Sequence, residues 1–198
     1  MTNTKNTKTK MLVEGAVMVA LATILSYIRI VKFPWGGAIT VLSMLPIVVF
    51  ALRYGVKSGL AVSFVYALVQ LGQGILLDGL LGWGLTVPML LACMFLDYLG
   101  AFSVLGLAGM FGNKSWGGII GGTVISMLLR LLLHFISGVV IFHSAGMLWE
   151  GFATENTWLY SLIYNGAYMV PEIIFTTAGA LALFKTPQMR KMLMRGTD

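Results

Sequence analysis

Four ionisable side chains stand inside long apolar runs of this sequence: Asp97, Arg130, His134 and Glu172. Charged groups are costly in hydrocarbon, so such residues usually face the interior of a helical bundle, where they pair with one another or with a ligand. A carboxylate and an imidazole in that setting can bind a cation or relay protons. The four residues therefore indicate a polar site inside a membrane-embedded bundle.

In one of these apolar runs, three residues are spaced so that they share one helical face. Arg130, His134 and Gly138 follow one another at intervals of four residues, so they share a face that is polar at first and then notched by the glycine. The opposite face consists of Leu, Ile and Val and suits lipid. Polar and aromatic residues follow in the last apolar run, and we expect two of them, Tyr160 and Asn165, to converge with Asp97 and His134 in the outer half of the bundle.

Such a site suits a small heteroaromatic cation, because a carboxylate can pair with the charge and aromatic faces attract cations by about 0.5–2 kcal/mol each. Several alternatives stay open from the residues alone. Asp97 can instead form an internal salt bridge with Arg130, and His134 can be a structural histidine. Arg130 and Glu172 favour structural pairing. Tyr164 and Tyr168 are typical of an interfacial aromatic belt.

Composition assigns the chain to a bilayer. It has 198 residues, of which 58% are hydrophobic and 10% are charged, whereas soluble domains carry about 25% charged residues. The length allows one bundle of about six spans and leaves no room for a soluble catalytic domain. The single cysteine, Cys93, excludes an intrachain disulfide. A net charge of +6 indicates basic cytoplasmic loops rather than binding to nucleic acid.

The sequence predicts an all-α membrane protein, a bundle of six transmembrane helices within residues 11–184. A disordered basic tail is expected at 1–10 and a basic cytoplasmic tail at 185–198. Turn-forming residues separate the apolar runs, and the first run lacks a small-residue cleavage site, so it is a retained helix rather than a signal peptide. The expected helices cover residues 11–31, 39–52, 58–77, 87–111, 119–142 and 158–184.

The distribution of basic residues orients this bundle. Lys and Arg concentrate in the two tails and in the turns after the second and fourth helices: Lys5, Lys8, Lys10, Arg53, Lys57, Lys114, Lys185, Arg190, Lys191 and Arg195. The opposite loops hold only Arg29 and Lys32, together with the acidic residues Asp78, Glu150 and Glu155. The positive-inside rule then places both termini in the cytoplasm of a bacterial cell membrane.

Small residues four apart recur at Ala16 and Ala20, at Gly118 and Gly122, and at Ala178 and Ala182. Such patterns allow two helix backbones to approach closely, although they also arise by chance in an apolar chain. Enzyme signatures are missing from the sequence, which has neither a phosphate-binding P-loop nor a histidine and cysteine spacing suited to metal. We therefore expect no enzyme, no cofactor and no metal.

Three motifs carry a family resemblance: LDYLGAF at 96–102, HFISGVVIF at 134–142 and YSLIYNGAYMVPE at 160–172. In this order and spacing they resemble the thiamine-specific substrate-binding components (S-components) of energy-coupling factor (ECF) transporters, the ThiT/YuaJ family. The resemblance extends from VEGAVMVALATIL at 13–25 to the tail. It implies a subunit that binds thiamine from outside and then associates with a transmembrane coupling subunit and two cytoplasmic ATPases.

The resemblance also implies roles for particular residues. Asp97 would face the thiazolium or the aminopyrimidine of the vitamin, next to Tyr98, and further polar contacts would come from His134, Tyr160 and Asn165. Aromatic contacts would come from Phe142, Tyr66 and, in a lid-like first loop, Trp35. Ala16 and Ala20 match the family's docking motif. Rival interpretations are an S-component for riboflavin or a pyrimidine precursor, and a stand-alone proton-coupled carrier that uses the four intramembrane charges.

Overall fold

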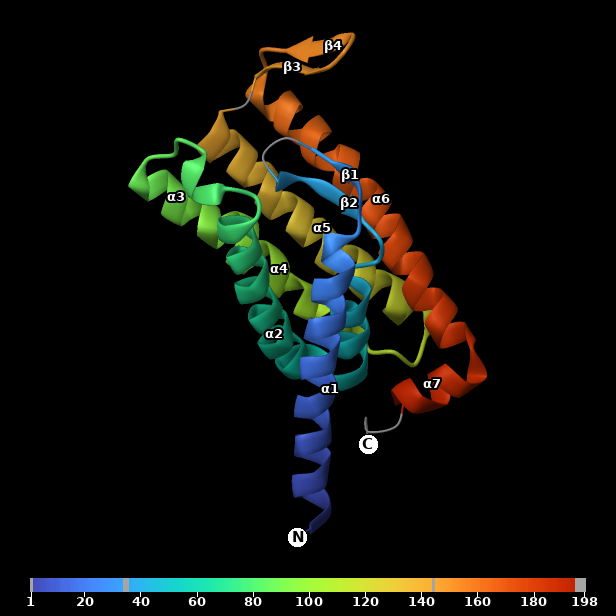
Figure 1. Cartoon of the computed structure of the whole chain (residues 1–198). Coiled ribbons are helices and arrows are strands. Elements are labelled where there is room, and N and C mark those ends of the chain that lie inside the picture. Colours follow the sequence, from blue (N-terminus) through green and yellow to red (C-terminus); the bar gives the residue numbers. More distant parts are fainter. Residues whose placement is uncertain (1, 34–35, 144, 195–198) are drawn as a thin grey trace.

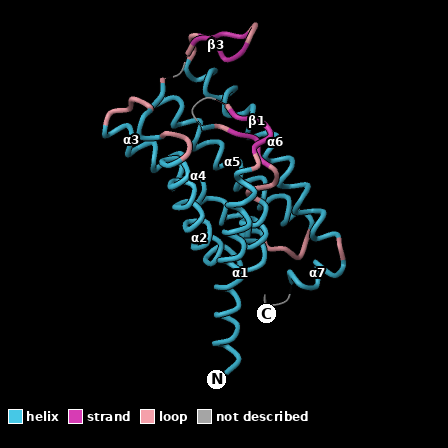
Figure 2. Tube along the Cα trace, viewed as in Figure 1, coloured by secondary structure: helices cyan, strands magenta, loops and turns pink. Residues whose placement is uncertain are grey.

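A computed structural model describes residues 2–33, 36–143 and 145–194, which form a helical bundle (Figures 1 and 2). Within the described residues, five helical stretches are long and apolar enough to cross a membrane. They are Thr7–Tyr27, Leu45–Leu76, Val87–Phe111, Trp116–Phe142 and Thr157–Lys185. The expected class, a multi-pass helical membrane protein, is therefore confirmed.

Helix α1 covers Thr2–Tyr27 and differs from the prediction at both ends. Residues 2–10, expected to be disordered, are helical and extend below the bundle (Figure 1), since this stretch holds no glycine or proline to end a helix. The helix stops before residue 31 because the chain turns into strand β1, Arg29–Lys32, which pairs antiparallel with β2, Ala38–Thr40. This hairpin also takes the residues with which the second helix was expected to begin.

Helix α2, Leu45–Leu76, contains both the second and the third expected helices. Its backbone leaves the helical region at Gly55, with φ 77° and ψ 177°. A Cβ on Gly59 would lie 2.8 Å from the Cβ of Ala51, although residues eight apart in a straight helix are separated by about 12 Å. The two arms of α2 therefore fold back on each other at Gly55, within the basic turn predicted at 53–57.

The predicted helix at 87–111 is continuous but irregular. It consists of α3 (Val87–Cys93), the π-helical η3 (Met94–Gly100), α4 (Ala101–Ser103) and the 3₁₀-helical η4 (Val104–Phe111). Helix α5, Trp116–Ser137, likewise ends in a π-helical segment, η5, Gly138–Phe142. A π-turn takes an extra residue and redirects the side chains after it, and such turns occur frequently at functional sites.

Helix α6, Thr157–Lys185, runs along the bundle, and the remaining short elements lie at its two ends (Figure 1). This helix agrees with the prediction, and Asn156 caps it by accepting from the backbone N–H groups of Trp158 and Leu159. The short helix η2, Leu80–Gly82, follows α2, and the hairpin of β3 (Gly146–Trp149) and β4 (Phe152–Thr154) precedes α6. At the opposite end, beside both termini, the basic tail forms α7, Pro187–Met194.

The three small-residue patterns have different outcomes. Cβ atoms on Gly118 and Gly122 would collide with the backbone carbonyls of Phe111 and Ala108, so this pair marks a close contact between α5 and η4. Ala16 and Ala20 of α1 are exposed, as are Ala178 and Ala182 of α6. These two pairs lie on the outside of the bundle.

The approach of α5 to η4 depends on the absence of a side chain at Gly122. We expect Gly122→Ala to lower the stability of the purified protein by about 1–3 kcal/mol, because a rigid carbonyl cannot move aside as a flexible side chain would. Thermal unfolding in detergent measures this effect. Gly117→Ala is the matched control, since a Cβ there meets nothing within 4 Å and alanine favours a helix over glycine. Equal effects of the two substitutions would contradict the close contact.

Candidate functional site

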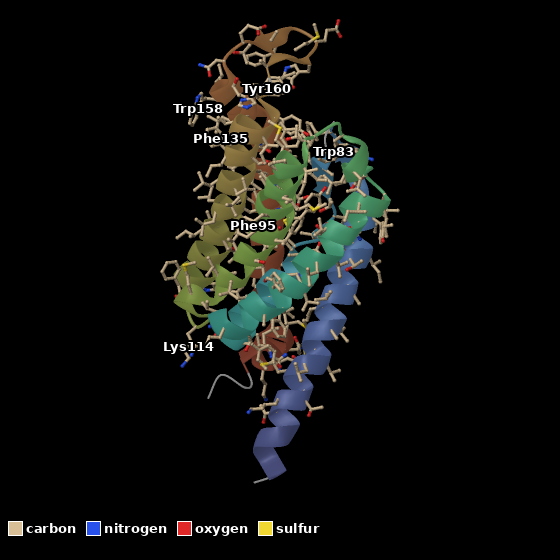
Figure 3. The ribbon with its side chains drawn as sticks, turned by 90° about the vertical axis from the view of Figure 1, so that its left-hand side faces the viewer. Trp83, Phe95, Lys114, Phe135, Trp158 and Tyr160 are labelled. Atoms are coloured by element: carbon tan, nitrogen blue, oxygen red, sulfur yellow. The ribbon has the colours of Figure 1, made fainter. Side chains whose placement is uncertain are left out.

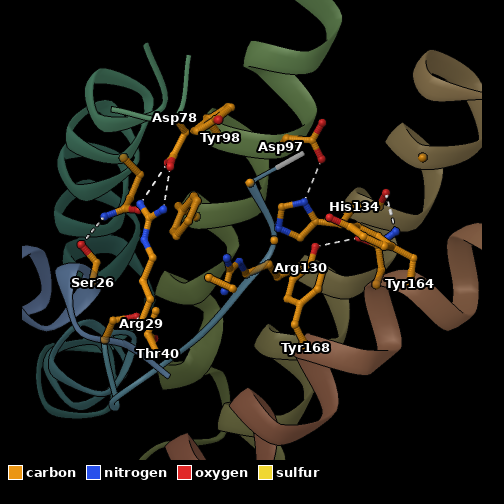
Figure 4. Close-up of a pocket in the computed structure, with 18 of the residues that line it drawn as sticks. Ser26, Arg29, Thr40, Asp78, Asp97, Tyr98, Arg130, His134, Tyr164 and Tyr168 are labelled. Carbon is orange, nitrogen blue, oxygen red and sulfur yellow. Dashed lines mark hydrogen bonds and ion pairs between the residues drawn. The ribbon is translucent and has the colours of Figure 1, made fainter. Parts of the chain in front are cut away.

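A cavity opens in the end of the bundle that lies away from both termini, and Figure 4 shows residues that line it. Its walls come from α1, the β1–β2 hairpin, the second arm of α2, η3, α5 with η5, and α6. Both π-helical segments contribute to it, since Asp97 and Tyr98 lie on η3 and Gly138 and Phe142 lie on η5. The irregular turns in two otherwise apolar helices thus occur where the chain lines this cavity.

The polar centre of the cavity is the Asp97 carboxylate. Its Oδ1 lies 2.8 Å from Nδ1 of His134 (Figure 4), and its Oδ2 accepts a hydrogen bond from the hydroxyl of Ser137. Because an ionised carboxylate only accepts, His134 donates through Nδ1. Its Nε2 is buried and has no partner among the described residues. The imidazole therefore keeps one nitrogen for a further partner.

Arg130 does not form the alternative salt bridge with Asp97. Its guanidinium lies 4.2 Å from the ring centroid of Phe102 and donates to the sulfur of Met44. Arg130 is only 6% exposed. Even so, no carboxylate of the described residues lies within 4.0 Å of its guanidinium. A cation over an aromatic face is attracted by the ring electrons, which partly offsets the lost solvation.

Glu172 pairs with Thr40 of strand β2. Its Oε1 accepts from the backbone N–H of Thr40 and, at 2.8 Å, from the Thr40 hydroxyl, which lies 2.6 Å from the hydroxyl of Ser43. The structural pairing predicted for Glu172 is therefore made with Thr40, and among the described residues no direct ion pair joins Glu172 to Arg130. Glu172 is fully buried and instead fixes the end of β2 to α6.

A second polar contact joins α5 to α6. The amide of Asn165 donates to the Ser161 carbonyl oxygen at 2.9 Å and to the His134 carbonyl oxygen at 3.3 Å. The hydroxyl of Tyr168 donates to Oδ1 of Asn165 at 2.7 Å (Figure 4). A Cβ on Gly138 would collide with the Ser161 hydroxyl, so the notch predicted on α5 receives α6. Asn165 thereby holds the backbone next to His134.

Aromatic rings line two sides of the cavity. On α6 the rings of Tyr160 and Tyr164 stack with centroids 6.3 Å apart, and Tyr168 meets His134 edge-on at 6.0 Å. On the other side Trp83 and Phe142 lie 6.0 Å apart. Figure 3 shows Trp83 and Tyr160 near the same end of the molecule. The Asp97 carboxylate therefore lies in a cavity that also presents several aromatic faces.

The structure gathers most of the predicted site residues. Six of them line the cavity: Asp97, Tyr98, His134, Phe142, Tyr160 and Asn165. Tyr66 is not among the lining residues; it is fully buried, and its ring meets Phe102 edge-on at 5.5 Å. Phe102 itself lines the cavity, so Tyr66 contacts a lining residue. Trp35 lies outside the described residues.

The sequence did not lead us to predict one polar cluster that lies at the cavity. The guanidinium of Arg29 donates to both carboxylate oxygens of Asp78, at 2.6 and 3.0 Å (Figure 4). Lys32 lies 3.2 Å from Oδ1 of the same carboxylate. The hydrogen bond to Asp78 raises the pKa of Arg29. Burial by itself would raise the pKa of Asp78, but the hydrogen bonds and charges of Arg29 and Lys32 lower it below its usual value.

Beside this pair, the hydroxyl of Ser26 donates to Oε1 of Gln73 at 3.1 Å and accepts from the Gln70 amide at 3.2 Å. Two glutamines in an apolar helix are a signal that the sequence contains, since buried amides require partners. The opposite charges that flank the same end of the bundle are a second signal. Neither signal shows which residue the glutamines or the charged side chains would contact.

The chain is similar in sequence to known thiamine transporters. A family model described as thiamine transporter protein (Thia_YuaJ) matches residues 12–192. Thiamine transporter ThiT of Bacillus subtilis is 35% identical over 191 residues, which cover 88% of this chain and 90% of the relative. Thiamine transporter ThiT of Lacticaseibacillus paracasei is 27% identical over 183 residues, with 83% and 82% covered.

A solved structure of ThiT from Listeria monocytogenes has a similar fold. Its TM-score is 0.70, and the match covers 92% of this chain and 97% of the other at 20% identity. At that identity the likeness concerns the fold alone. The family model and the Bacillus relative extend the likeness to the sequence over most of the chain.

The contribution of Asp78 to the stability of the fold should depend on pH. The pKa of Asp78 is lower in the fold than the value of about 3.9 for an unfolded chain. Its stabilising contribution is therefore complete above about pH 4 and is lost as the pH falls through the native pKa. We expect Asp78→Asn to unfold at a lower temperature than the parent protein at pH 7, with a difference that shrinks below about pH 4.

Thermal unfolding in detergent across this pH range measures the difference. Glu155→Gln is the matched control, because Glu155 is exposed and lies near the same end of the bundle. The unfolding temperature of Glu155→Gln should stay close to that of the parent protein at every pH. A deficit of Asp78→Asn that remains constant down to pH 3 would show that the carboxylate charge does not hold the hairpin.

Proposed function

The chain belongs to the thiamine transporter protein family, and on that premise we propose that it is the substrate-binding subunit of an ECF-type vitamin importer. It is a multi-pass membrane protein with a transport role rather than an enzyme. The proposed subunit binds thiamine from outside the cell and passes it on through an ATP-driven partner module. The observation that carries the proposal is the Asp97–His134 pair inside a cavity with aromatic walls.

Thiamine suits this cavity because it combines a permanent thiazolium cation with an aromatic aminopyrimidine. In the proposed complex Asp97 compensates the cation, and the rings of Tyr160 and Phe142 contact the heteroaromatic faces. The unpartnered Nε2 of His134 is placed for a polar group of the ligand. Tyr98, which also lines the cavity, completes the set. Asn165 acts mainly through His134, whose backbone carbonyl it holds.

Binding of the vitamin from outside requires a particular orientation of the bundle in the membrane. Both termini lie at one end of the bundle, opposite the cavity (Figure 1), and the sequence concentrates its Lys and Arg residues in segments at that end. We place this end in the cytoplasm by the positive-inside rule. The two arms of α2 then count as separate crossings, which gives six in total. Supporting this count, α2 folds back on itself at Gly55.

Coupling requires a surface for the partner module, which in the proposal consists of a transmembrane coupling subunit and two ATPases. Ala16 and Ala20 support helix α1 as that surface, because both are exposed and small residues allow another helix to approach. Large apolar side chains of α1 are also exposed nearby, including Val13 and Val17, each at 58%. Helix α1 therefore offers an apolar face with a shallow centre.

Fluorescence titration of the detergent-purified protein tests substrate identity, since Trp83 lines the cavity. We expect saturable quenching by thiamine and none by riboflavin. Asp97→Asn should weaken thiamine binding by about 1–3 kcal/mol through loss of a charge-assisted contact. Glu150→Gln, the same charge change on an exposed residue outside the cavity, should bind like the parent protein.

Four results would contradict the proposal, each in a different part. No saturable response to thiamine would exclude thiamine as the substrate, and saturation by riboflavin or a pyrimidine instead would identify a different vitamin. Unchanged affinity of Asp97→Asn would remove the carboxylate from the binding site. Uptake by this chain alone in proteoliposomes without ATP, abolished by a protonophore, would indicate a stand-alone carrier.

Docking is tested separately from binding. Ala16→Trp should leave thiamine binding to the purified protein unchanged, because the residue is exposed and distant from the cavity lining. It should abolish uptake by cells that contain the complete transporter, since the indole would separate the two helices. Ala178→Trp, at an exposed alanine of α6, is the matched control and should permit uptake. Normal uptake by Ala16→Trp would exclude this face of α1.

A further inference from the structure

A second cavity lies at the end of the molecule opposite the substrate site. It is lined by the bend of α2, including Arg53 and Gly55, and by the turn between η4 and α5, including Asn113, Lys114 and Ser115. Figure 3 places Lys114 at the end of the bundle farthest from Trp83. The space is open at two of the three glycines of the lining: a Cβ on Gly55 or Gly112 would meet nothing within 4 Å, whereas a Cβ on Gly109 would collide with the Ala51 carbonyl oxygen.

Cationic groups outnumber acidic ones around this basal cavity. The Arg53 guanidinium lies 3.1 Å from Oε2 of Glu14, and the hydroxyl of Tyr54 donates to the same oxygen at 2.6 Å. Lys10 lies 3.9 Å from the other oxygen of Glu14. Glu14 is thus already matched by two cations, which leaves Lys114 as a net positive charge at the cavity. An anion is the ligand that this balance favours.

Hydrogen-bond donors point to the same class of ligand. Asn113 is 3% exposed, and its Nδ2 has no partner among the described residues, although buried amide donors are normally paired. Helix α5 begins at Trp116, where Ser115 caps the backbone N–H of Gly118. The earlier N–H groups of a helix have no acceptor within it, and the helix dipole favours an anion there. Asn113 and Ser115, which directly precede α5, both line the basal cavity.

The other edge of the basal cavity is apolar. Leu52 and Phe111 line it, and Phe111 is 56% exposed. Trp116, which follows the lining residue Ser115, is 44% exposed, and the guanidinium of Arg190 in α7 lies 5.6 Å from its ring centroid. Exposed tryptophan beside arginine is typical of a membrane–water interface. The basal cavity is therefore polar on one side and suited to hydrocarbon on the other.

We propose that the basal cavity binds the phosphate group of an anionic phospholipid of the adjoining leaflet, with Asn113, Lys114 and the N-terminus of α5 as donors. Free inorganic phosphate shares this chemistry. The lipid is favoured because the exposed ring of Phe111 offers a surface for the glycerol and the first methylene groups, which inorganic phosphate lacks. The site is independent of the substrate that the opposite cavity binds.

Native mass spectrometry of the full chain with added phosphatidylglycerol or phosphatidylcholine tests the proposal. The parent protein should retain phosphatidylglycerol in preference to phosphatidylcholine. Lys114→Gln should reduce this retention about tenfold, the order expected for loss of a charge-assisted hydrogen bond. Asn113→Asp, which keeps the size of the side chain and adds a negative charge, should abolish it. Lys57→Gln removes the charge of an exposed lysine outside the cavity lining and should retain lipid like the parent protein.

Thermal unfolding in detergent supplies the second measurement. Phosphatidylglycerol should raise the unfolding temperature of the parent protein and of Lys57→Gln, but not that of Lys114→Gln, and inorganic phosphate at 10-fold molar excess over the lipid should not reproduce the rise. Equal losses of lipid from Lys57→Gln and Lys114→Gln would overturn the site in favour of general charge attraction. Stabilisation by inorganic phosphate but not by the lipid would overturn the lipid assignment.

Discussion

Asp97 can lie among apolar helices only because α5 satisfies both of its carboxylate oxygens, one through His134 and the other through Ser137. These contacts require α5 and η3 to keep one rotation and one height relative to each other. Asn165 then extends the constraint to α6 by binding the carbonyl next to the His134 side chain. The Gly138 notch permits this contact. The position of the aromatic face of α6 therefore depends on the half-buried Asp97 carboxylate.

The hairpin over the cavity depends on a related constraint. Arg29 and Asp78 fix its first strand to the end of α2, and Glu172 fixes its second strand through Thr40. Between these attachments Gly37 lies so close to α6 that a Cβ there would stand 2.9 Å from the Tyr164 hydroxyl. A larger residue would hold the hairpin away from the tyrosines. The cover of the cavity is thus attached by charges at its ends and shaped by a glycine at its centre.

The apolar runs were sufficient to predict the helices, and the turn at 53–57 appears as the bend at Gly55. The errors arise where local preference competes with context. Residues 2–10 are polar but lack a helix breaker, so they continue α1. Residues 29–32 are apolar enough to extend α1, but they pair with β2 across a turn. Tyr66 was expected at the site by resemblance, whereas it is fully buried against Phe102, a contact that depends on the packing of α2 against α4.

By itself the sequence determined that the protein lies in a membrane and that Arg130, His134 and Gly138 share a helical face, because both follow from composition and a fixed helical period. Partner choice was decided by the tertiary structure. Asp97 binds His134 rather than Arg130, and Glu172 binds Thr40, 132 positions away. Helical spacing fixes the face of a residue but not which distant residue lies opposite. That depends on where glycines let helices approach and where π-turns redirect side chains.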